Sequence, residues 1–437
     1  MRNRTRAPFS IAIIGGGITG LTLAIALHRR NVDCTVYEQA PSFKEIGAGL
    51  GFHPGAVQAL RLCDEDIFRA FEKVCTVNKW DSKRHVWFDV FDGTADVPAN
   101  ELEPAFTIVQ PQTGGGSCHR ARFLDKLVKL LPKDRDIARF DKRLERIEDD
   151  EGGCLITFCD GTVARADAVI GCDGIKSRTR ELMLGDDKLT QAKCGYSGKY
   201  AYRCLIPMAE AIEALGEEKA ANTSLWMGPN CHALTFPVSH GNTLNLVAFV
   251  SDNKRWPDEA RLTLPATREE ILHDFREFGP NVSRLIAMID EKPDRWGLFD
   301  LAEHPLPGYF RGRICLAGDA AHASTPHHGA GAGVSIEDVA VLSTLLADES
   351  LRGPEDLEAV FAAYDESRRA RTQWLVQSSR RAADLYEWRD AKIGKDYDGI
   401  LGEINARQAY IWNLDLRAEL DSAREGLKRR LASRSGS

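Results

Sequence analysis

The chain lacks any apolar run long enough to cross a membrane or to form the core of a secretory signal. Its basic N-terminus is followed by an apolar stretch, Ile11 to Ile14, that has only the length of a strand. Among its 11 cysteines there is no C-x-x-C pair and no Cys/His spacing typical of a metal site. An odd number of cysteines without a secretory signal predicts reduced thiols. We therefore expect a cytoplasmic protein without stable membrane association and without a bound metal.

An excess of basic charge is also missing. The sequence has 57 Lys and Arg against 64 Asp and Glu, a net charge of −7, which argues against a nucleic-acid partner. With 437 residues, of which 43% are hydrophobic and 28% charged, it has the composition of a globular protein of two or three domains. Internal repeats and low-complexity tracts are absent from the sequence. Both a monomer and a homodimer are compatible with these properties.

A glycine-rich junction near the N-terminus carries the first functional signal. Gly15, Gly17 and Gly20 join a strand-like apolar run to a helical pattern with the G-x-G-x-x-G spacing of a dinucleotide-binding turn. A second apolar run ends in Glu38, where such folds place the carboxylate that binds a ribose hydroxyl. The alternative is an ordinary βαβ unit whose Glu38 is solvated. Because turn, helix and acid agree, we predict a dinucleotide site.

Two further positions point to the same ligand. The segment 47–55 is rich in glycine and contains Gly51, so we expect its backbone to lie along the cofactor, with a flexible surface loop as the alternative. Arg120 stands at the start of a helical pattern, where a cation opposes the helix dipole unless an anion is bound. We predict that Arg120 contacts the cofactor; the alternative is a surface arginine.

Two more strand–turn–helix junctions follow along the chain. The first contains Asp173-Gly174, with Ser177 as a helix N-cap candidate and Arg180 three residues later. The second ends a strand in Gly318-Asp319 and continues through the glycine-rich segment 329–333 into a long helical pattern. A strand end places the Asp319 carboxylate at the carboxyl edge of a sheet, where α/β folds bind ligands.

The remaining strands have a different pattern. Residues 86–93 and several runs between 199 and 250 alternate apolar and polar residues, which predicts an antiparallel sheet with one covered face. The predicted fold class is therefore α/β, with a Rossmann-like domain and an inserted, mainly antiparallel substrate domain. The predicted parts are a cofactor domain of residues 1–80, 105–184 and 305–385, a substrate domain of 81–104 and 185–304, and C-terminal helices over 386–437.

The three junctions in this order resemble those of the group A flavoprotein aromatic monooxygenases, which have the para-hydroxybenzoate hydroxylase fold. The resemblance implies non-covalently bound FAD, NADH or NADPH as electron donor, and O2 as co-substrate that forms a flavin C4a-hydroperoxide. It assigns Glu38 to the ribose and Arg120 to the flavin. It also assigns cofactor contacts to Gly15, Gly17, Gly20, Gly51, Asp173, Asp319 and Ala332.

Within this family the chain looks most like salicylate hydroxylases, for example at Asp173-Gly-Ile-Lys-Ser and Ala201-Tyr-Arg203. That resemblance implies decarboxylative hydroxylation of salicylate to catechol. Residues 326–331 also resemble fungal phenol-dearomatising monooxygenases of polyketide pathways, which implies hydroxylation of a resorcylic aldehyde or related phenol as the alternative. Those enzymes carry a tyrosine where this chain has Phe236. A flavin-binding redox sensor without turnover is a third reading.

A salicylate-like substrate needs a cation for its carboxylate and an acceptor for its phenol proton. Arg203 suits the first role, because a guanidinium binds a carboxylate with two hydrogen bonds. His327 suits the second, because a neutral imidazole can accept a phenol proton. The alternatives are a structural ion pair for Arg203 and a histidine that only binds backbone for His327. We expect Leu234, Phe236 and His328 in the pocket wall, His232 in wall or core, and a structural role for His322.

Overall fold

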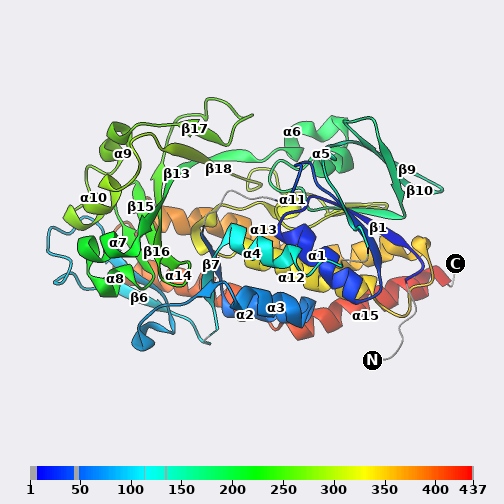
Figure 1. Ribbon diagram of the computed structural model, residues 1–437, viewed down its shortest axis with the longest axis horizontal. Helices are drawn as coiled ribbons and strands as arrows, with labels where there is room; N and C mark the ends of the chain where they lie inside the picture. The colour runs from blue at the N-terminus through cyan, green and yellow to red at the C-terminus, as the bar shows by residue number, and fades with distance from the viewer. Residues whose placement is uncertain (1–6, 44–48, 113, 133–134, 436–437) are drawn as a thin grey trace.

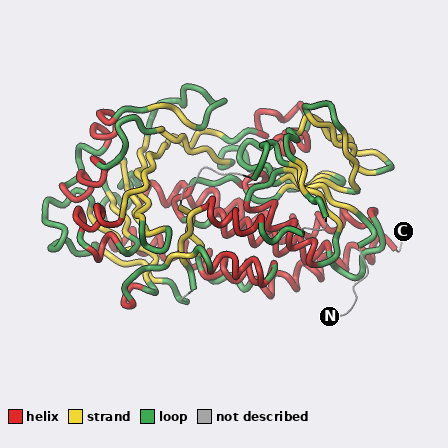
Figure 2. The backbone as a smooth tube through the Cα atoms, in the orientation of Figure 1, coloured by secondary structure: helices red, strands yellow, loops and turns green. Residues whose placement is uncertain are grey.

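The computed structural model describes residues 7–43, 49–112, 114–132 and 135–435. Strands gather at two ends of an elongated molecule, and long helices run between them (Figures 1 and 2). No helix of the described residues has the length and apolar character needed to span a membrane.

One end is built on a six-stranded sheet with the strand order β19-β20-β12-β1-β2-β8. All neighbours in it are parallel except β19 and β20. Its strands are β1 (Ser10–Ile14), β2 (Asp33–Tyr37), β8 (Ala138–Arg139), β12 (Ala168–Gly171), β19 (Phe310–Arg311) and β20 (Ile314–Leu316). The central strands are continuous apolar runs because helices or loops cover both faces of a parallel sheet.

Helices pack closely around this sheet, and α12 lies against α1, α2, α13 and α15. The helices of this part are α1 (Ile18–Arg29), α2 (Pro54–Cys63), α3 (Glu65–Glu72), α4 (Arg120–Val128), α5 (Arg178–Leu184), α6 (Leu189–Ala192), α11 (Asp319–His322), α12 (Gly331–Leu346), α13 (Leu357–Tyr386) and α15 (Leu416–Ser435). Short 3-10 turns are η2 (Asp186–Lys188), η3 (Pro326–His328) and η4 (Pro354–Asp356). Two small antiparallel sheets adjoin it: β3 (Gly49–Phe52), β7 (Gly116–His119) and β4 (Cys75–Thr76); and β9 (Leu144–Asp150), β10 (Gly153–Phe158) and β11 (Val163–Ala166).

The other end is an eight-stranded sheet in the order β17-β18-β13-β16-β15-β14-β5-β6. Its strands are β5 (Val86–Asp92), β6 (Phe106–Val109), β13 (Gly195–Pro207), β14 (Ser224–Met227), β15 (Cys231–Val238), β16 (Thr243–Ser251), β17 (Thr263–Pro265) and β18 (Asp294–Asp300). Associated helices are η1 (Asp81–Lys83), α7 (Met208–Leu215), α8 (Glu217–Ala220), α9 (Arg268–Asp274), α10 (Pro280–Ala287) and α14 (Tyr397–Trp412). Helices α7, α9 and α10 share a core with Tyr200 and Tyr202 on one face of β13, which leaves the other face for the site.

The Rossmann-like fold with an inserted, mainly antiparallel sheet and C-terminal helices is confirmed, but two details differ from the predicted segments. Strand β6 pairs with β5 in the eight-stranded sheet, although the predicted cofactor domain resumed at residue 105. Within the C-terminal segment, Ile400 and Ile404 of α14 pack with the eight-stranded sheet, whereas Leu420 and Leu427 of α15 pack in the core of the six-stranded sheet. The division into domains itself stays a prediction.

Glycine is required sterically at the β1–α1 turn. Gly15 has a φ of +102°, a conformation that other residues rarely adopt. A Cβ atom on Gly20 would lie 2.0 Å from the Gly15 carbonyl oxygen, so only glycine lets α1 approach the turn this closely. The first and third positions of the Gly15-x-Gly17-x-x-Gly20 motif therefore require glycine for conformational and steric reasons.

This geometry predicts opposite effects of one substitution at two helical positions. Gly20→Ala should lower the free energy of unfolding by about 1–3 kcal/mol, because the added methyl overlaps backbone. Gly402→Ala in α14 is the matched control, since a Cβ atom on Gly402 would have no neighbouring atom within 4 Å outside its own helix backbone; it should raise stability by about 0.5–1 kcal/mol. Urea unfolding of both variants checks this, and equal stability of the two would contradict the steric reading.

Candidate active site

The three predicted junctions lie together at one edge of the six-stranded sheet. Strands β1, β12 and β20 are neighbours and parallel, so their carboxyl ends meet there. A Cβ on Gly15 would lie 2.5 Å from the Cys172 carbonyl oxygen, and one on Gly318 would lie 2.9 Å from the Thr19 hydroxyl. The turns are therefore in contact with one another along this edge of the sheet.

Glu38 ends β2 at this edge and shapes the first turn. One carboxylate oxygen accepts a hydrogen bond from the Gly16 N–H at 2.7 Å, and the other accepts one from the Ala40 N–H at 2.8 Å. Each oxygen keeps a further lone pair. The half-buried carboxylate can therefore hold the turn and still accept hydrogen bonds from a ribose.

Asp173 and Arg180, by contrast, are occupied within the protein. The Asp173 carboxylate accepts hydrogen bonds from the Ser177 hydroxyl at 2.5 Å and from the N–H and hydroxyl of Thr179 at 2.9 and 3.0 Å. Burial raises the pKa of Asp173, against the effect of these hydrogen bonds. The Arg180 guanidinium donates to backbone carbonyls, among them that of Ala320 at 2.9 Å. This second junction therefore offers a cofactor mainly its backbone.

Asp319 differs from Asp173 in that its carboxylate is available. It is the first residue of α11 and is exposed. Among the described residues its side chain accepts no hydrogen bond. Asp319 thus lies at the carboxyl edge of the sheet, as predicted, and its carboxylate has no hydrogen-bond donor among the described residues.

The N-terminus of α12 also opens into this region. Ala330 caps the 16-residue helix without a side-chain hydrogen bond, and Ala332 lies in its first turn, where backbone N–H groups have no partner inside the helix. A Cβ on Gly333 would lie 2.6 Å from the Ala56 Cβ, so the helix approaches α2 closely. His53 caps α2 beside it, and burial lowers the pKa of His53 to about 4, which keeps it neutral.

Strand β3 places Gly51 at the boundary between the two large sheets. Residues 47 and 48 of the predicted glycine-rich segment 47–55 lie outside the described residues. Gly51 pairs with Ser117 on β7, and a Cβ on it would lie 3.4 Å from the Trp87 ring. A Cβ on Gly49 would lie 2.4 Å from the Phe236 ring, so Phe236 packs directly on this strand. Arg120 is the first residue of α4, directly after β7, and is half-buried.

The face of the eight-stranded sheet that is turned toward these elements carries the predicted substrate residues. Arg203 on β13, Val247 on β16 and Leu234 on β15 form one cross-strand row. His232 and Phe249 belong to the next row on the same face, because side chains alternate along a strand with a period of two. The structure therefore brings Arg203, Leu234, Phe236 and the elements around η3 to one site.

Arg203 is a guanidinium without a counter-ion among the described residues. It lies over the Trp296 ring, with 4.9 Å between its Cζ and the ring centroid, and its Nε is buried without a hydrogen-bond partner. Burial and the nearby Arg120 lower the pKa of Arg203 to about 10, so it stays charged at neutral pH. A structural ion pair is thus excluded within the described part of the chain. An unpaired buried cation of this kind fits an anionic ligand.

His327 in η3 packs on the same sheet face, against the rings of His232 and Phe249. Its Nδ1 lies 3.3 Å from Nε2 of His232, and its ring is 4.9 Å from that of Phe249. Its Nε2 is buried without a hydrogen-bond partner. Burial, followed by the positive groups nearby, lowers the pKa of His327 far below its usual value, so the ring is neutral. His327 therefore binds another side chain, not only backbone.

Two neighbouring histidines, His328 of η3 and His322 of α11, have structural partners. His328 Nε2 lies 2.9 Å from the Ser378 hydroxyl of α13, and burial lowers the pKa of His328 to about 3. Its contact with α13 makes it an anchor for η3, although it was predicted as part of the pocket wall. His322 Nε2 lies 2.5 Å from Asp338, in agreement with the structural role predicted for it.

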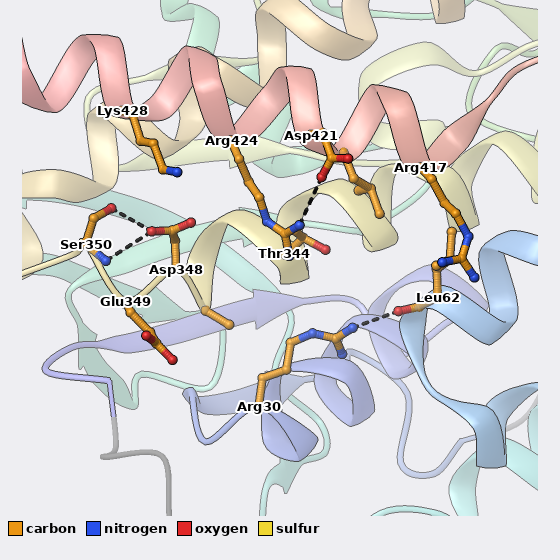
Figure 3. A pocket seen from close by; sticks show the side chains of 12 residues that line it. Arg30, Leu62, Thr344, Asp348, Glu349, Ser350, Arg417, Asp421, Arg424 and Lys428 are labelled. Atoms are coloured by element: carbon orange, nitrogen blue, oxygen red, sulfur yellow. Dashed lines mark hydrogen bonds and ion pairs between the residues drawn. The ribbon is translucent and has the colours of Figure 1, made fainter. Parts of the chain in front are cut away.

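A separate cavity of about 970 Å³ lies at the opposite ends of α1 and α12. Figure 3 shows charged side chains of both signs around it, including Arg30, Asp348 and Arg424. Helix α12 is about 24 Å long at 1.5 Å per residue, so this cavity is far from the glycine turns and from His327. This cavity is therefore not part of the candidate site.

The residues at the sheet edge fit FAD, the cofactor implied by the resemblance. The glycine turns suit phosphates, as do the first-turn N–H groups of α1 and α12, which have no side-chain cap among the described residues; Glu38 suits a ribose. Gly51 and Arg120 are placed between this edge and the substrate sheet, where the flavin end of the cofactor would lie.

Comparisons with known proteins agree with this fit. A family model described as FAD binding domain matches residues 257–379, and one described as NAD(P)-binding Rossmann-like domain matches residues 13–43. The chain is 44% identical to the FAD-dependent monooxygenase orf3 of Aspergillus niger over 97% of each chain. It is 39% identical to salicylate hydroxylase asL1 of Sarocladium schorii, over 96% of this chain and 91% of that one.

A solved structure, a salicylate hydroxylase substrate complex, is 33% identical to this chain and covers 95% of it and 98% of its own length, with a TM-score of 0.83. The resemblance inferred from the three junctions is thereby confirmed. The chain belongs to the FAD-dependent monooxygenases of the aromatic hydroxylase type.

Proposed function

We propose that this enzyme hydroxylates a small phenol that carries an anionic group next to its hydroxyl, with NADH or NADPH and O2 as co-substrates. Salicylate, converted to catechol with loss of CO2, is the substrate that fits this description best. The observation that carries the proposal is the guanidinium of Arg203, which has no counter-ion among the described residues and whose Nε is buried without a hydrogen-bond partner there.

Arg203 and His327 lie at adjacent rows of one sheet face. His327 packs over the row of His232 and Phe249, and Arg203 belongs to the adjacent row on that face. Rows two residues apart are about 7 Å apart along the strands. That separation is comparable to the length of a substituted benzene ring, so the two groups can bind opposite ends of one phenol.

Each of the two groups has a distinct part in the reaction. Bound FAD, reduced by the nicotinamide co-substrate, supplies the activation of O2. Arg203 holds the substrate carboxylate and fixes the orientation of the ring. His327 Nε2 accepts the phenol proton, which raises the electron density of the ring carbon that is to be oxygenated. Leu234 and Phe249 exclude water around it.

A second candidate is hydroxylation of a larger phenolic polyketide or resorcylic aldehyde without loss of CO2. Its support is that the chain is more similar to orf3, which is named an FAD-dependent monooxygenase, than to asL1, which is named a salicylate hydroxylase. Salicylate is therefore not the only substrate to consider. Arg203 would then hold the phenolate or carbonyl oxygen. Phe236 argues against the dearomatising variant of this reaction, because it has no hydroxyl with which to bind a phenolate.

Replacement of Arg203 should separate substrate binding from cofactor binding. Arg203→Met should weaken binding of salicylate roughly 10- to 100-fold, because charge-assisted hydrogen bonds are each worth about 1.5–3 kcal/mol. FAD content should stay unchanged. Titration of the flavin absorbance with salicylate measures the affinity.

The matched control is Arg295→Met on the neighbouring strand β18. Arg295 lies over Tyr200 on the opposite face of the sheet, with 5.1 Å between its Cζ and the ring centroid. It should bind salicylate like the unchanged protein. Equal affinity of the Arg203→Met protein and the unchanged protein would rule out the carboxylate role.

A phenol panel decides between the two substrate classes. Salicylate should stimulate NADH or NADPH consumption by at least tenfold and yield catechol and CO2, identified by mass. A resorcylic aldehyde should give the larger stimulation if the second candidate is right. If no phenol stimulates consumption, the protein binds flavin without turnover and the proposal is wrong.

A further inference from the structure

A line of buried polar contacts runs from His327 away from the pocket. His327 Nδ1 lies 3.3 Å from His232 Nε2, and His232 Nδ1 lies 3.0 Å from Glu387 Oε1. The other carboxylate oxygen of Glu387 accepts hydrogen bonds from Lys199 Nζ at 2.5 Å and from the Ser251 hydroxyl. All of them except Ser251 are at most 5% exposed.

The line reaches the surface at its far end. Lys199 Nζ lies 3.1 Å from a carboxylate oxygen of Asp384, whose side chain is 42% exposed. Glu387 directly follows α13, and Asp384 lies in its last turn, so one helix end supplies both carboxylates. The contacts therefore join the substrate pocket to solvent through the eight-stranded sheet.

Charge fixes the direction of every hydrogen bond in this line. Burial opposes ionisation of Glu387, but its hydrogen bonds and Lys199 outweigh this and hold its pKa below the usual value, so it is an acceptor. His232 must therefore donate from Nδ1, and because burial lowers the pKa of His232 it is neutral and accepts at Nε2. His327 must then donate from Nδ1. Only its Nε2, the atom with no partner, is left with a lone pair for the substrate.

Other ionisable groups face this line from several elements. Tyr386 of α13 stacks near His232, Cys231 precedes it on β15, His328 follows His327 in η3, and Arg389 lies 3.9 Å from Asp384. Burial raises the pKa of both Tyr386 and Cys231, so both stay neutral at physiological pH. None of them is hydrogen-bonded between His327 and Glu387. The four-residue line is thus the direct route.

We propose that His232, Glu387 and Lys199 form a proton relay that sets the tautomer of His327 and carries the phenol proton from the pocket to solvent at Asp384. This inference rests on the proposed role of His327 as the proton acceptor. In this relay His232, Glu387 and Lys199 contact neither substrate nor cofactor. They position His327 and carry a proton away from it.

The proton count of the relay closes. The phenol O–H breaks and its proton bonds to His327 Nε2, while His327 Nδ1–H passes to His232 Nε2 and His232 Nδ1–H passes to Glu387. Lys199 loses one proton to Asp384 and water, and then regains one from Glu387. One proton leaves to solvent, and the carboxylate and ammonium are restored. Both histidines return to their starting tautomers when their rings reorient, or when the transfers reverse before product release and the His327 Nε2 proton neutralises the phenolate of the bound product.

The tautomers can be measured without any substrate. In the FAD-bound protein labelled with 15N-histidine, long-range 1H–15N correlation spectra near pH 7.5 should show His232 and His327 protonated at Nδ1 only. Glu387→Gln should introduce the Nε2–H form at His232 or His327, since the amide can also donate. Glu366→Gln, an exposed acid of the same helix that pairs with Arg430, is the matched control and should change nothing. An Nε2–H form of His327 in the unchanged protein would overturn the relay.

Proton transfer itself can be followed with 5-nitrosalicylate, whose phenolate absorbs visible light. Mixed anaerobically with oxidised holoenzyme, it should show its phenolate band together with proton release to an indicator dye. His232→Phe and Glu387→Gln should slow proton release at least tenfold with FAD content and melting temperature retained, whereas Glu366→Gln should not.

The pattern of variants separates the two claims. If His327→Gln abolishes the phenolate band while His232→Phe and Glu387→Gln release protons at the normal rate, His327 is the acceptor and the relay is wrong. If His327→Gln leaves the band intact, the proposed role of His327 is itself wrong. Slowed release in both relay variants, with the control unchanged, supports the relay.

Discussion

The architecture depends on two adjacent carboxylates buried in α12, Glu337 and Asp338. Arg368 of α13 donates to both, at 2.6 and 3.0 Å, and Arg371 donates to Glu337. Asp338 also binds His322 and the backbone of the β20–α11 turn. Burial alone would raise the pKa of both acids, but their cationic partners hold each pKa below its usual value. Loss of one partner from such a network leaves an uncompensated buried charge, which typically costs about 3–5 kcal/mol. The network therefore fixes where α11, α12 and α13 lie around the cofactor crevice.

The proposed substrate side differs from this network, because two of its polar side chains lack partners among the described residues. Arg203 is charged without a counter-ion among the described residues, and His327 is neutral with an open lone pair. Both are held by surrounding rings, Trp296 for Arg203 and Phe249 for His327, so neither needs to reorganise when a ligand arrives. A site whose charges and dipoles are oriented in advance stabilises a polar transition state more effectively than water does. Burying these polar groups costs free energy during folding, and the ion pairs of the cofactor half offset that cost.

The sequence predicted the Rossmann-like fold of the cofactor half because its signals are local. Glycine spacing and Glu38 report turns and strand ends within a single βαβ unit, and the Arg203 strand was recognisable from its alternation. The role of Asp173 was harder to predict. Whether its carboxylate faces a ligand or binds the first turn of α5 depends on the position of that helix. The N-cap role of Ser177 was predicted from the sequence. The relay could not be predicted, because Glu387 is 155 residues from His232 and only the packing of a helix end on a strand joins them. The sequence pattern predicted no strand at β6 and placed residues 105–184 in the cofactor domain, whereas pairing with β5 joins β6 to the eight-stranded sheet.

Helix α13 is 30 residues long, about 45 Å at 1.5 Å per residue, and it serves both halves of the molecule. Its first half holds Arg368 against α12, while its end places Asp384 and Glu387 beside the substrate sheet. Successive side chains on a helix point about 100° apart around its axis, so the directions of the side chains in the first half of α13 fix those in the second half. A single-residue insertion in the middle of α13 would preserve either set of contacts but not both. The inserted sheet is therefore not an exchangeable module: a chimera of two such enzymes would have to transfer the second half of α13 along with the sheet.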